Sequence, residues 1–210
     1  MPNGVQVPDV PDMRDQSDLS ELKPFALFLG TMNYPPNSDA AVYFAREILP
    51  LARQTHPQLK FVIAGRDPDR RVRELTTIPG VVIAGAVSDP FRYFRKADVT
   101  VAPFRISQGF HNKIAESLAV GTPVVTTSRA MAGIGLSERE GLFVADTPEE
   151  FAGKVSRVLK DPCLRSELRE GASSVRQRLS WDGHLCRLEQ LIVQVATKSV
   201  NPSCELVTGL

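Results

Sequence analysis

The stretch PFRISQGFHNKIAESLAVGTPVV, residues 103–125, decides the fold class of this chain. A polar loop that contains Gly109 leads into a segment, 110–120, whose apolar residues recur at the spacing of one helix face. A Gly-Thr-Pro turn ends that predicted helix, and a β-branched run follows directly. Loop, helix and strand in this order are typical of one unit of an α/β sheet.

The same alternation extends outward in both directions. Apolar runs that end at or near glycine are separated by segments with helical spacing, which favours a parallel sheet covered on both faces. The sequence therefore predicts a single Rossmann-like α/β domain with a doubly wound, six-stranded parallel sheet. The strands are expected at 25–30, 59–65, 80–85, 98–103, 123–127 and 141–145, and the other helices at 37–54, 67–78, 89–97, 147–161, 162–179 and 182–197.

The domain is expected to span residues 24–197. Residues 1–23 are rich in proline and aspartate and lack periodicity, so they are expected to form an extended segment. Residues 198–210 are interpreted as a C-terminal tail.

Several predicted helices begin with capping residues. Thr147, followed by proline and then by glutamate three residues after the threonine, predicts a capping box. Asp89 is expected to cap the helix at 89–97. Asn37 or Ser38 is expected to cap the helix at 37–54.

Composition and charge exclude several function classes. The 25 basic and 24 acidic side chains give a net charge of +1, so no global field favours nucleic acid or a membrane surface as a partner. No apolar run reaches the length of a transmembrane helix. The three cysteines and three histidines lack disulfide or metal-ligand spacing. We therefore expect no metal site and a cytoplasmic location.

The candidate ligand site lies at the start of the 110–120 helix. Ligands of parallel α/β sheets bind at the carboxyl ends of strands, and this helix follows the fourth predicted strand. Its first N–H groups and Lys113 suit a phosphate, Gly109 allows close approach of the backbone, and Glu116 suits the hydroxyls of a ribose. The helical wheel places Lys113 and Glu116 opposite the apolar stripe, so a solvated ion pair is the alternative interpretation.

Six motifs in order carry a resemblance to a known family. They are LFLGTMNYPPNSDAAVYFAREILP, FVIAGRDP, GVVIAGAVSDPFRYFRKADVTVAPFR, GFHNKIAESLAVGTPVVTT, GLFVADTPEEFAGKV and LSWDGHLCRLEQL. Through these motifs and their order, the chain resembles the C-terminal half of the group 1, or family 4, retaining glycosyltransferases of the GT-B fold. It is most similar to the sugar transferases of bacterial exopolysaccharide systems. The resemblance implies a domain that binds a UDP- or GDP-linked sugar as substrate, with no cofactor and no metal.

The resemblance also implies roles for individual residues. Glu116 is expected to bind the nucleotide ribose, and Lys113 is expected to lie near the diphosphate. The loop at 107–112 is expected to contact the phosphates or the donor sugar, and Val87 is expected to border the base. Arg66 or Arg105 is a candidate to supply a further positive charge to the diphosphate, because each lies in a loop after a predicted strand. The remaining candidates for donor binding are Gly30, Gln108, Gly109, Phe110 and Asn112.

The chain departs from the family pattern in two respects. Gln108 stands where many relatives carry the first acid of an E-x7-E motif, and an amide cannot act as a carboxylate. No catalytic residue is therefore assigned. The acceptor-binding, amino-terminal half of the family has no counterpart here, and PNGV at 2–5 resembles the sequence before the inter-domain linker. We expect a domain that is inactive alone and is completed by an N-terminal acceptor domain, with the full enzyme peripheral to the inner membrane.

Two alternative functions remain at this point. One is a non-catalytic nucleotide-binding or interaction module, or a split-gene subunit. The other is a sugar-nucleotide epimerase of similar architecture. A Rossmann dehydrogenase is disfavoured because the first strand leads into GTMNYPPN rather than G-x-G-x-x-G.

Overall fold

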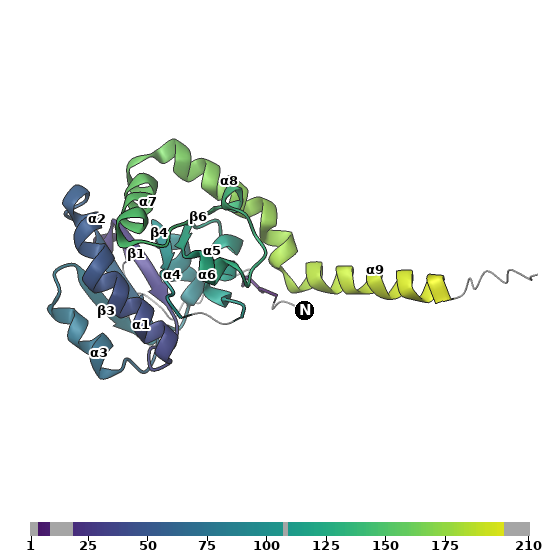
Figure 1. The fold of residues 1–210 in the computed structure, drawn as a ribbon, viewed down its shortest axis with the longest axis horizontal. Coiled ribbons are helices and arrows are strands. Elements are labelled where there is room, and N and C mark those ends of the chain that lie inside the picture. Colours follow the sequence, from purple (N-terminus) through teal and green to yellow (C-terminus); the bar gives the residue numbers. More distant parts are fainter. Residues whose placement is uncertain (1–3, 9–18, 107–108, 200–210) are drawn as a thin grey trace, which may run out of the picture.

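The computed structural model describes residues 4–8, 19–106 and 109–199, and its centre is a six-stranded, all-parallel sheet (Figure 1). The strand order is β3-β2-β1-β4-β5-β6. This order and the helices on both sheet faces confirm the predicted doubly wound α/β fold. The strands are β1 (Phe25–Leu29), β2 (Lys60–Ala64), β3 (Val81–Gly85), β4 (Val99–Ala102), β5 (Val124–Thr126) and β6 (Leu142–Val144).

Side chains of the central strand β1 point alternately to the two faces of the sheet. Phe28 packs with the larger hydrophobic cluster, which also holds residues of the helices that follow β1, β4 and β6. Phe25 and Leu27 pack with a smaller cluster that includes Phe94. Strands buried on both faces must be apolar throughout, which explains why the strand segments could be predicted from the sequence.

The helical run after β1 differs in detail from the prediction. It begins at Pro35 rather than at residue 37 and consists of α1 (Pro35–Tyr43), a π-helical turn (Phe44–Ile48) and α2 (Leu49–Thr55). Pro50 has no N–H to donate to the carbonyl of Arg46, and its ring crowds that carbonyl, which accounts for the widened turn just before it. The predicted Asn37 or Ser38 cap is wrong, because Tyr34 occupies the N-cap position.

The other helices follow the predicted order. Asp89 caps α4 by accepting the N–H of Arg92 at 3.1 Å, as predicted. Thr147 accepts the N–H of Glu150 at 3.3 Å, but the Glu150 carboxylate accepts from Asp146 rather than closing the box on Thr147. The helices are α3 (Arg70–Arg73) with a 3-10 turn (Glu74–Thr77), α4 (Pro90–Lys96), α5 (Asn112–Ala119), α7 (Pro148–Lys160), α8 (Pro162–Leu179) and α9 (Trp181–Ser199).

Three short helical turns were not predicted from the sequence. α6 (Ser128–Met131) follows β5 directly, and the Thr127 hydroxyl accepts the N–H of Ala130 at its start. The other two are 3-10 turns, Ser20–Leu22 and Glu138–Glu140. Segments of three or four residues are too short to show an apolar period.

The N-terminal segment of the described chain lies against the end of α8. Val5 forms an isolated parallel bridge with Ser180 and donates its N–H to the carbonyl of Leu179 at 2.6 Å. Val5 is also buried against the main core, although it precedes the predicted domain boundary at residue 23. That boundary stays a prediction, and most of the predicted tail at 198–210 lies outside the described residues.

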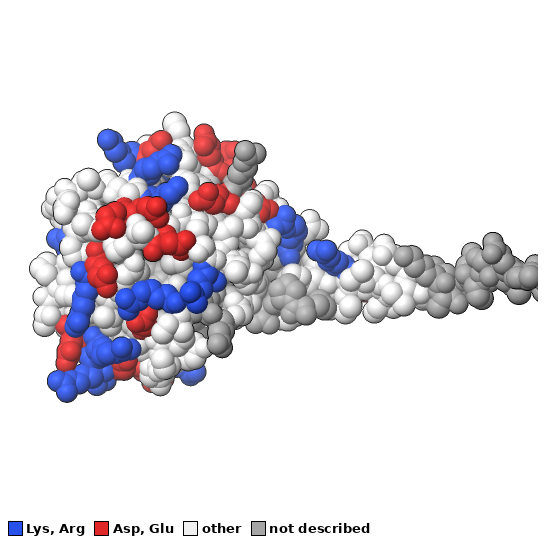
Figure 2. All heavy atoms as spheres, viewed as in Figure 1, with Lys and Arg blue, Asp and Glu red and all other residues white. Residues whose placement is uncertain are grey.

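The helix α9 projects away from the body of the domain (Figure 1). Acidic and basic side chains are interspersed over the face shown in Figure 2, with no broad area of one sign, in keeping with the net charge of +1. Within the described part of the chain, no helix is both long and apolar enough to cross a bilayer.

Candidate functional site

A pocket of about 310 Å³ opens at the carboxyl edge of the sheet, between the end of β1, the start of α1 and the first turns of α5. It brings together five of the ten predicted donor-binding residues. It also contains His111, from the loop predicted to contact the phosphates or the donor sugar, and three residues that were not among the donor-binding predictions: Leu29, Tyr34 and Asn37. The lining residues are Leu29, Gly30, Tyr34, Asn37, Phe110, His111, Asn112, Lys113 and Glu116.

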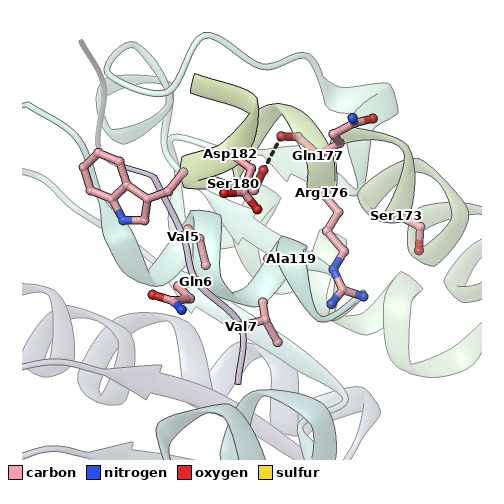
Figure 3. Close-up of a pocket in the computed structure, with 10 residues that line it drawn as sticks. Val5, Gln6, Val7, Ala119, Ser173, Arg176, Gln177, Ser180 and Asp182 are labelled. Atoms are coloured by element: carbon pink, nitrogen blue, oxygen red, sulfur yellow. Dashed lines mark hydrogen bonds between the residues drawn. The ribbon is translucent and has the colours of Figure 1, made fainter. Parts of the chain in front are cut away.

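A larger hollow of about 650 Å³ lies elsewhere, at the corner between α8 and α9 (Figure 3). The extended segment Val5–Gln6–Val7 crosses it, and Arg176 and Trp181 are among its lining residues. Its wall includes Ala119, the last residue of α5, whereas the 310 Å³ pocket contains the first residues of that helix. It therefore lies away from the strand ends where ligands of such sheets bind.

Lys113 is the central charged group of the strand-edge pocket. Only 9% of its surface is exposed, and its ammonium group donates a hydrogen bond to Asn37 Oδ1 at 2.7 Å. The ammonium also lies 4.7 Å from the ring centre of Phe28 and 4.5 Å from that of Phe104. Burial lowers the pKa of Lys113 to about 7, and the nearby Glu116 carboxylate offsets part of that effect.

The helical-wheel prediction for Lys113 is wrong. The wheel put its side chain on the polar half of α5, where it would pair with Glu116 in solvent. Instead the side chain reaches across to α1, because Phe28 from β1 and Phe104 after β4 cover it. A solvated ion pair therefore does not describe Lys113.

Asn37 is a pocket residue that was not predicted to bind the donor. Its side-chain amide donates to the carbonyl of Thr31 at 2.9 Å, and its Oδ1 accepts from Lys113. Asn37 thus ties the loop after β1 to the start of α5. The sequence did show that Asn37 is one of the few polar side chains in the loop after the first strand. Its hydrogen-bond partner, Lys113, lies 76 residues away in the sequence, so the contact itself could not be predicted.

Glu116 and His111 complete the charged part of the pocket. Burial raises the pKa of the Glu116 carboxyl, and the Lys113 charge acts in the opposite direction. His111 occupies the N-cap position of α5 without a side-chain capping bond, and its ring stacks on Phe104 at 4.3 Å between ring centres. Burial, with a smaller contribution from Lys113, lowers the pKa of His111 to about 4. At neutral pH His111 is therefore uncharged.

Glycines permit the close approach of the loops around the pocket. Gly109 has a φ of 77°, a left-handed conformation that favours glycine, and it lies directly before Phe110. A Cβ on Gly133 would overlap the Gly109 carbonyl, so the loop after α6 lies against the loop that enters α5. A Cβ on Gly30 would lie 2.8 Å from Asn37 Nδ2 and 3.3 Å from Lys113 Nζ.

We expect Gly30→Ala to destabilise the domain by about 1–3 kcal/mol, because the added methyl group displaces Asn37 or Lys113. Urea unfolding monitored by circular dichroism measures the change in free energy of unfolding. The matched control is Gly153→Ala on α7, where an added Cβ meets no atom within 4 Å. Alanine is the better helix former by about 1 kcal/mol, so the control is expected to be stabilised. Equal stability of Gly30→Ala and the parent chain would show that the pocket is looser than described.

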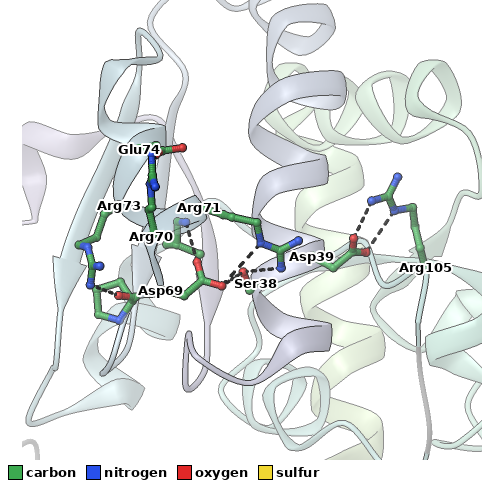
Figure 4. A network of polar contacts seen from close by, with 10 residues as sticks. Ser38, Asp39, Asp69, Arg70, Arg71, Arg73, Glu74 and Arg105 are labelled. Carbon is green, nitrogen blue, oxygen red and sulfur yellow. Dashed lines mark hydrogen bonds and ion pairs between the residues drawn. The ribbon is translucent and has the colours of Figure 1, made fainter.

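The other predicted residues lie outside the pocket lining. Arg105 binds both carboxylate oxygens of Asp39, at 2.6 and 3.1 Å, and its guanidinium lies 4.5 Å from the ring centre of Tyr43 (Figure 4). Arg66 is exposed and pairs with its neighbour Asp67 at 3.7 Å. Val87 is half-buried after β3. Their predicted roles in donor binding stay predictions, and Gln108 lies outside the described residues.

A second polar network joins α1 to α3 in Figure 4. The Ser38 hydroxyl donates to Asp69 Oδ2 at 2.5 Å and accepts from Arg71 at 2.9 Å. Asp69 also caps α3, because its Oδ1 accepts the N–H of Val72. Both carboxylate oxygens of Asp69 therefore accept hydrogen bonds from within the domain. Over residues 4–8, 19–106 and 109–199, no group of three or more His, Cys, Asp or Glu side chains could hold a metal ion.

The structure defines the chain as a Rossmann-like α/β domain with a polar pocket at the strand ends. The family described as "Glycosyl transferases group 1" matches residues 23–161, which is more than half of the chain. The chain belongs to this family, and its fold is that of the C-terminal domain of a GT-B glycosyltransferase.

Two curated bacterial proteins are similar in sequence. One is the D-inositol 3-phosphate glycosyltransferase of Thermomonospora curvata, 35% identical over 46% of this chain and 22% of that protein. The other is the phosphatidyl-myo-inositol mannosyltransferase of Propionibacterium freudenreichii subsp. shermanii, 31% identical over 57% of this chain and 29% of that protein. The match thus spans less than a third of the length of either protein.

A solved structure supports the fold. The Anabaena protein HepE, in complex with UDP and glucose, superimposes with a TM-score of 0.62 at 16% identity. The alignment covers 83% of this chain and 48% of HepE. At this identity the likeness concerns the fold alone.

Proposed function

We propose that this chain binds the nucleotide-sugar donor of a retaining glycosyltransferase in the pocket between β1, α1 and α5. An N-terminal acceptor domain would complete the enzyme, and the products would be glycans or lipid-linked glycans such as exopolysaccharides. Family membership and the complex of HepE with UDP and glucose support this proposal. A cytoplasmic location, at the inner membrane in the full enzyme, stays a prediction.

The observation that carries the proposal is the position of Lys113. Its ammonium lies beside the first turn of α5, where the helix has N–H groups without intrahelical acceptors and the positive end of its dipole. A diphosphate in the pocket would face both. The buried ammonium is held by Asn37 and two aromatic rings, so it is already oriented before a ligand arrives.

Glu116 suits the other half of a nucleotide. It lies one turn further along α5 on the same pocket wall, and its carboxylate can accept hydrogen bonds from the two hydroxyls of a ribose. One helix would thereby hold the diphosphate at its start and the ribose one turn later. No described group is assigned as the catalytic acid or base.

Charge stabilisation is the chemistry that these groups can supply. Cleavage of the sugar–phosphate bond leaves negative charge on the departing nucleoside diphosphate. Lys113 and the N-terminal turn of α5 would stabilise that charge without a metal ion or a cofactor. Donors linked to UDP or GDP carry the same diphosphate, so this mechanism serves either nucleotide.

We expect the purified chain to bind UDP or GDP with a dissociation constant below 1 mM, measured by isothermal titration calorimetry. UMP or GMP is the control, and it should bind at least about tenfold more weakly because it lacks the second phosphate. A folded sample that binds neither diphosphate at millimolar concentration would contradict the proposal. Binding without sugar transfer, after a separately expressed acceptor domain is added, would favour the non-catalytic module instead.

A further inference from the structure

A second pocket, of about 390 Å³, adjoins the proposed donor pocket. It lies between the 134–136 loop after α6 and the corner where α8 meets α9. Phe110 is the residue common to the linings of the two pockets, so they lie side by side at this position. The backbone at Gly133 lies close to the Gly109 carbonyl, so the two loops approach each other at this point.

The polar side chains of this second pocket are all basic. They are Arg178 at the end of α8 and His184 and Arg187 in the first turns of α9, and no lining residue is acidic. Glu140 lies nearby and pairs with Arg178 at 2.8 Å, so it neutralises one of the two guanidinium groups. Arg187 is exposed, and the described residues give it no carboxylate within 4.0 Å.

His184 adds an observation that points to a ligand. Its Nε2 atom is buried and has no hydrogen-bond partner in the described structure. A buried polar atom without a partner is costly, and native structures keep few of them.

The ring of His184 is carried by a well-defined corner. Ser180 Oγ accepts the N–H of Gly183 at 3.0 Å and donates to the Gln177 carbonyl at 2.7 Å. The N–H of His184 donates to the carbonyl of Ser180 at 3.1 Å. A Cβ on Gly183 would overlap the Gln177 carbonyl, so glycine is required for this tight turn.

We propose that this second pocket binds a phosphate group carried by the acceptor, which places the acceptor next to the donor sugar. The assignment rests on the proposed function for its acceptor role. Two guanidinium groups and an imidazole N–H can donate to separate phosphate oxygens, and Arg forks suit phosphate particularly well. The apolar side chains of Phe110 and Leu136 shield these bonds from water.

The test uses the whole chain with the donor pocket saturated by UDP, so that added phosphate cannot occupy that pocket. The probe is sn-glycerol 3-phosphate, with glycerol as its uncharged control, and the readout is the imidazole NMR signal of His184. We expect a saturable shift of that signal with the phosphate and none with glycerol. Arg187→Gln should weaken binding about five- to tenfold. Arg176→Gln, which alters the hollow of Figure 3 instead, should leave it unchanged.

The outcomes separate this proposal from the proposed function. If UDP binds but the His184 signal does not move, the phosphate subsite is wrong and the donor pocket stands. Equal losses in Arg187→Gln and Arg176→Gln would also overturn it, because they would indicate a general charge effect. If inorganic phosphate binds more tightly than sn-glycerol 3-phosphate, free phosphate is the ligand and the acceptor role is wrong. If UDP fails to bind while sn-glycerol 3-phosphate binds, the proposed function and the acceptor role fall, but the phosphate pocket itself is supported.

Discussion

Replacing Lys113 with methionine is expected to weaken the binding of UDP-glucose by about 10- to 100-fold, which corresponds to the loss of one hydrogen bond to a charged group. Methionine keeps most of the side-chain volume, so Phe28 and Phe104 retain their packing. Isothermal titration calorimetry of the variant and the parent chain measures the effect.

The stability of this variant should change little. A buried ammonium is replaced by an apolar group, which removes a desolvation penalty, while Asn37 Oδ1 loses its donor. These effects oppose each other, and the free energy of unfolding should stay within about 1 kcal/mol of the parent. The matched control is Lys160→Met at the exposed end of α7, which should bind UDP-glucose normally. Equal affinity of Lys113→Met and Lys160→Met would remove Lys113 from the site.

The same lysine predicts a pH dependence of binding. Burial lowers the pKa of Lys113 to about 7 in the free protein, so the ammonium form dominates below that pH and the neutral form above it. A diphosphate favours the ammonium form, so affinity for UDP-glucose should fall as the pH rises through 7, by up to about tenfold per pH unit. UDP-glucose is the better probe because its diphosphate keeps a constant charge near neutrality. With a pKa of about 4, His111 does not titrate in this range, and Lys113→Met should show a flat profile.

Glu116→Ala is expected to weaken UDP binding by about 10- to 100-fold and to abolish the preference for a ribose with both hydroxyls. The parent chain should bind UDP more tightly than 2′-deoxy-UDP, because the deoxy ligand leaves part of the half-buried carboxylate unpaired. Calorimetric titrations of both proteins with both ligands form a double-mutant cycle. The cycle isolates the contact between the Glu116 carboxylate and the 2′-hydroxyl.

The control for this cycle is Glu170→Ala, which removes an exposed carboxylate from α8. It should keep both the affinity and the preference for UDP. If Glu116→Ala retained the full preference for UDP over its deoxy form, the ribose assignment would be wrong even if overall affinity fell.

Most of the fold was predictable because the sheet is buried on both faces. Each strand had to be an apolar run, and the turns after Leu29 and Ala64 carry glycine where the two loops approach each other. The sequence did not show the π-helical turn before Pro50 or the helix α6. The first depends on a single missing N–H, and the second is only four residues long.

The candidate site was predictable in outline for the same reason. Parallel strands end at one edge, so Gly30 and the start of the 110–120 helix had to meet there. Arg105 shows the limit of that argument. Arg105 does lie in the loop after β4, as predicted. Its guanidinium, however, pairs with Asp39 on α1, and Arg105 is not among the residues that line the pocket.

The sequence by itself determined the parallel sheet, the edge at which the candidate pocket lies, and the helix that carries Lys113 and Glu116. These three features follow from the spacing of apolar residues within each segment and from the order of the segments along the chain. Only the tertiary structure decided that Lys113 is buried and bonded to Asn37, because a helical wheel describes one helix and omits its neighbours. Phe28 and Phe104 come from two other segments of the chain, and their rings remove the ammonium from water. That desolvation, which acts only once the strands are assembled, turns an ordinary surface-type lysine into a preoriented group that titrates near neutral pH.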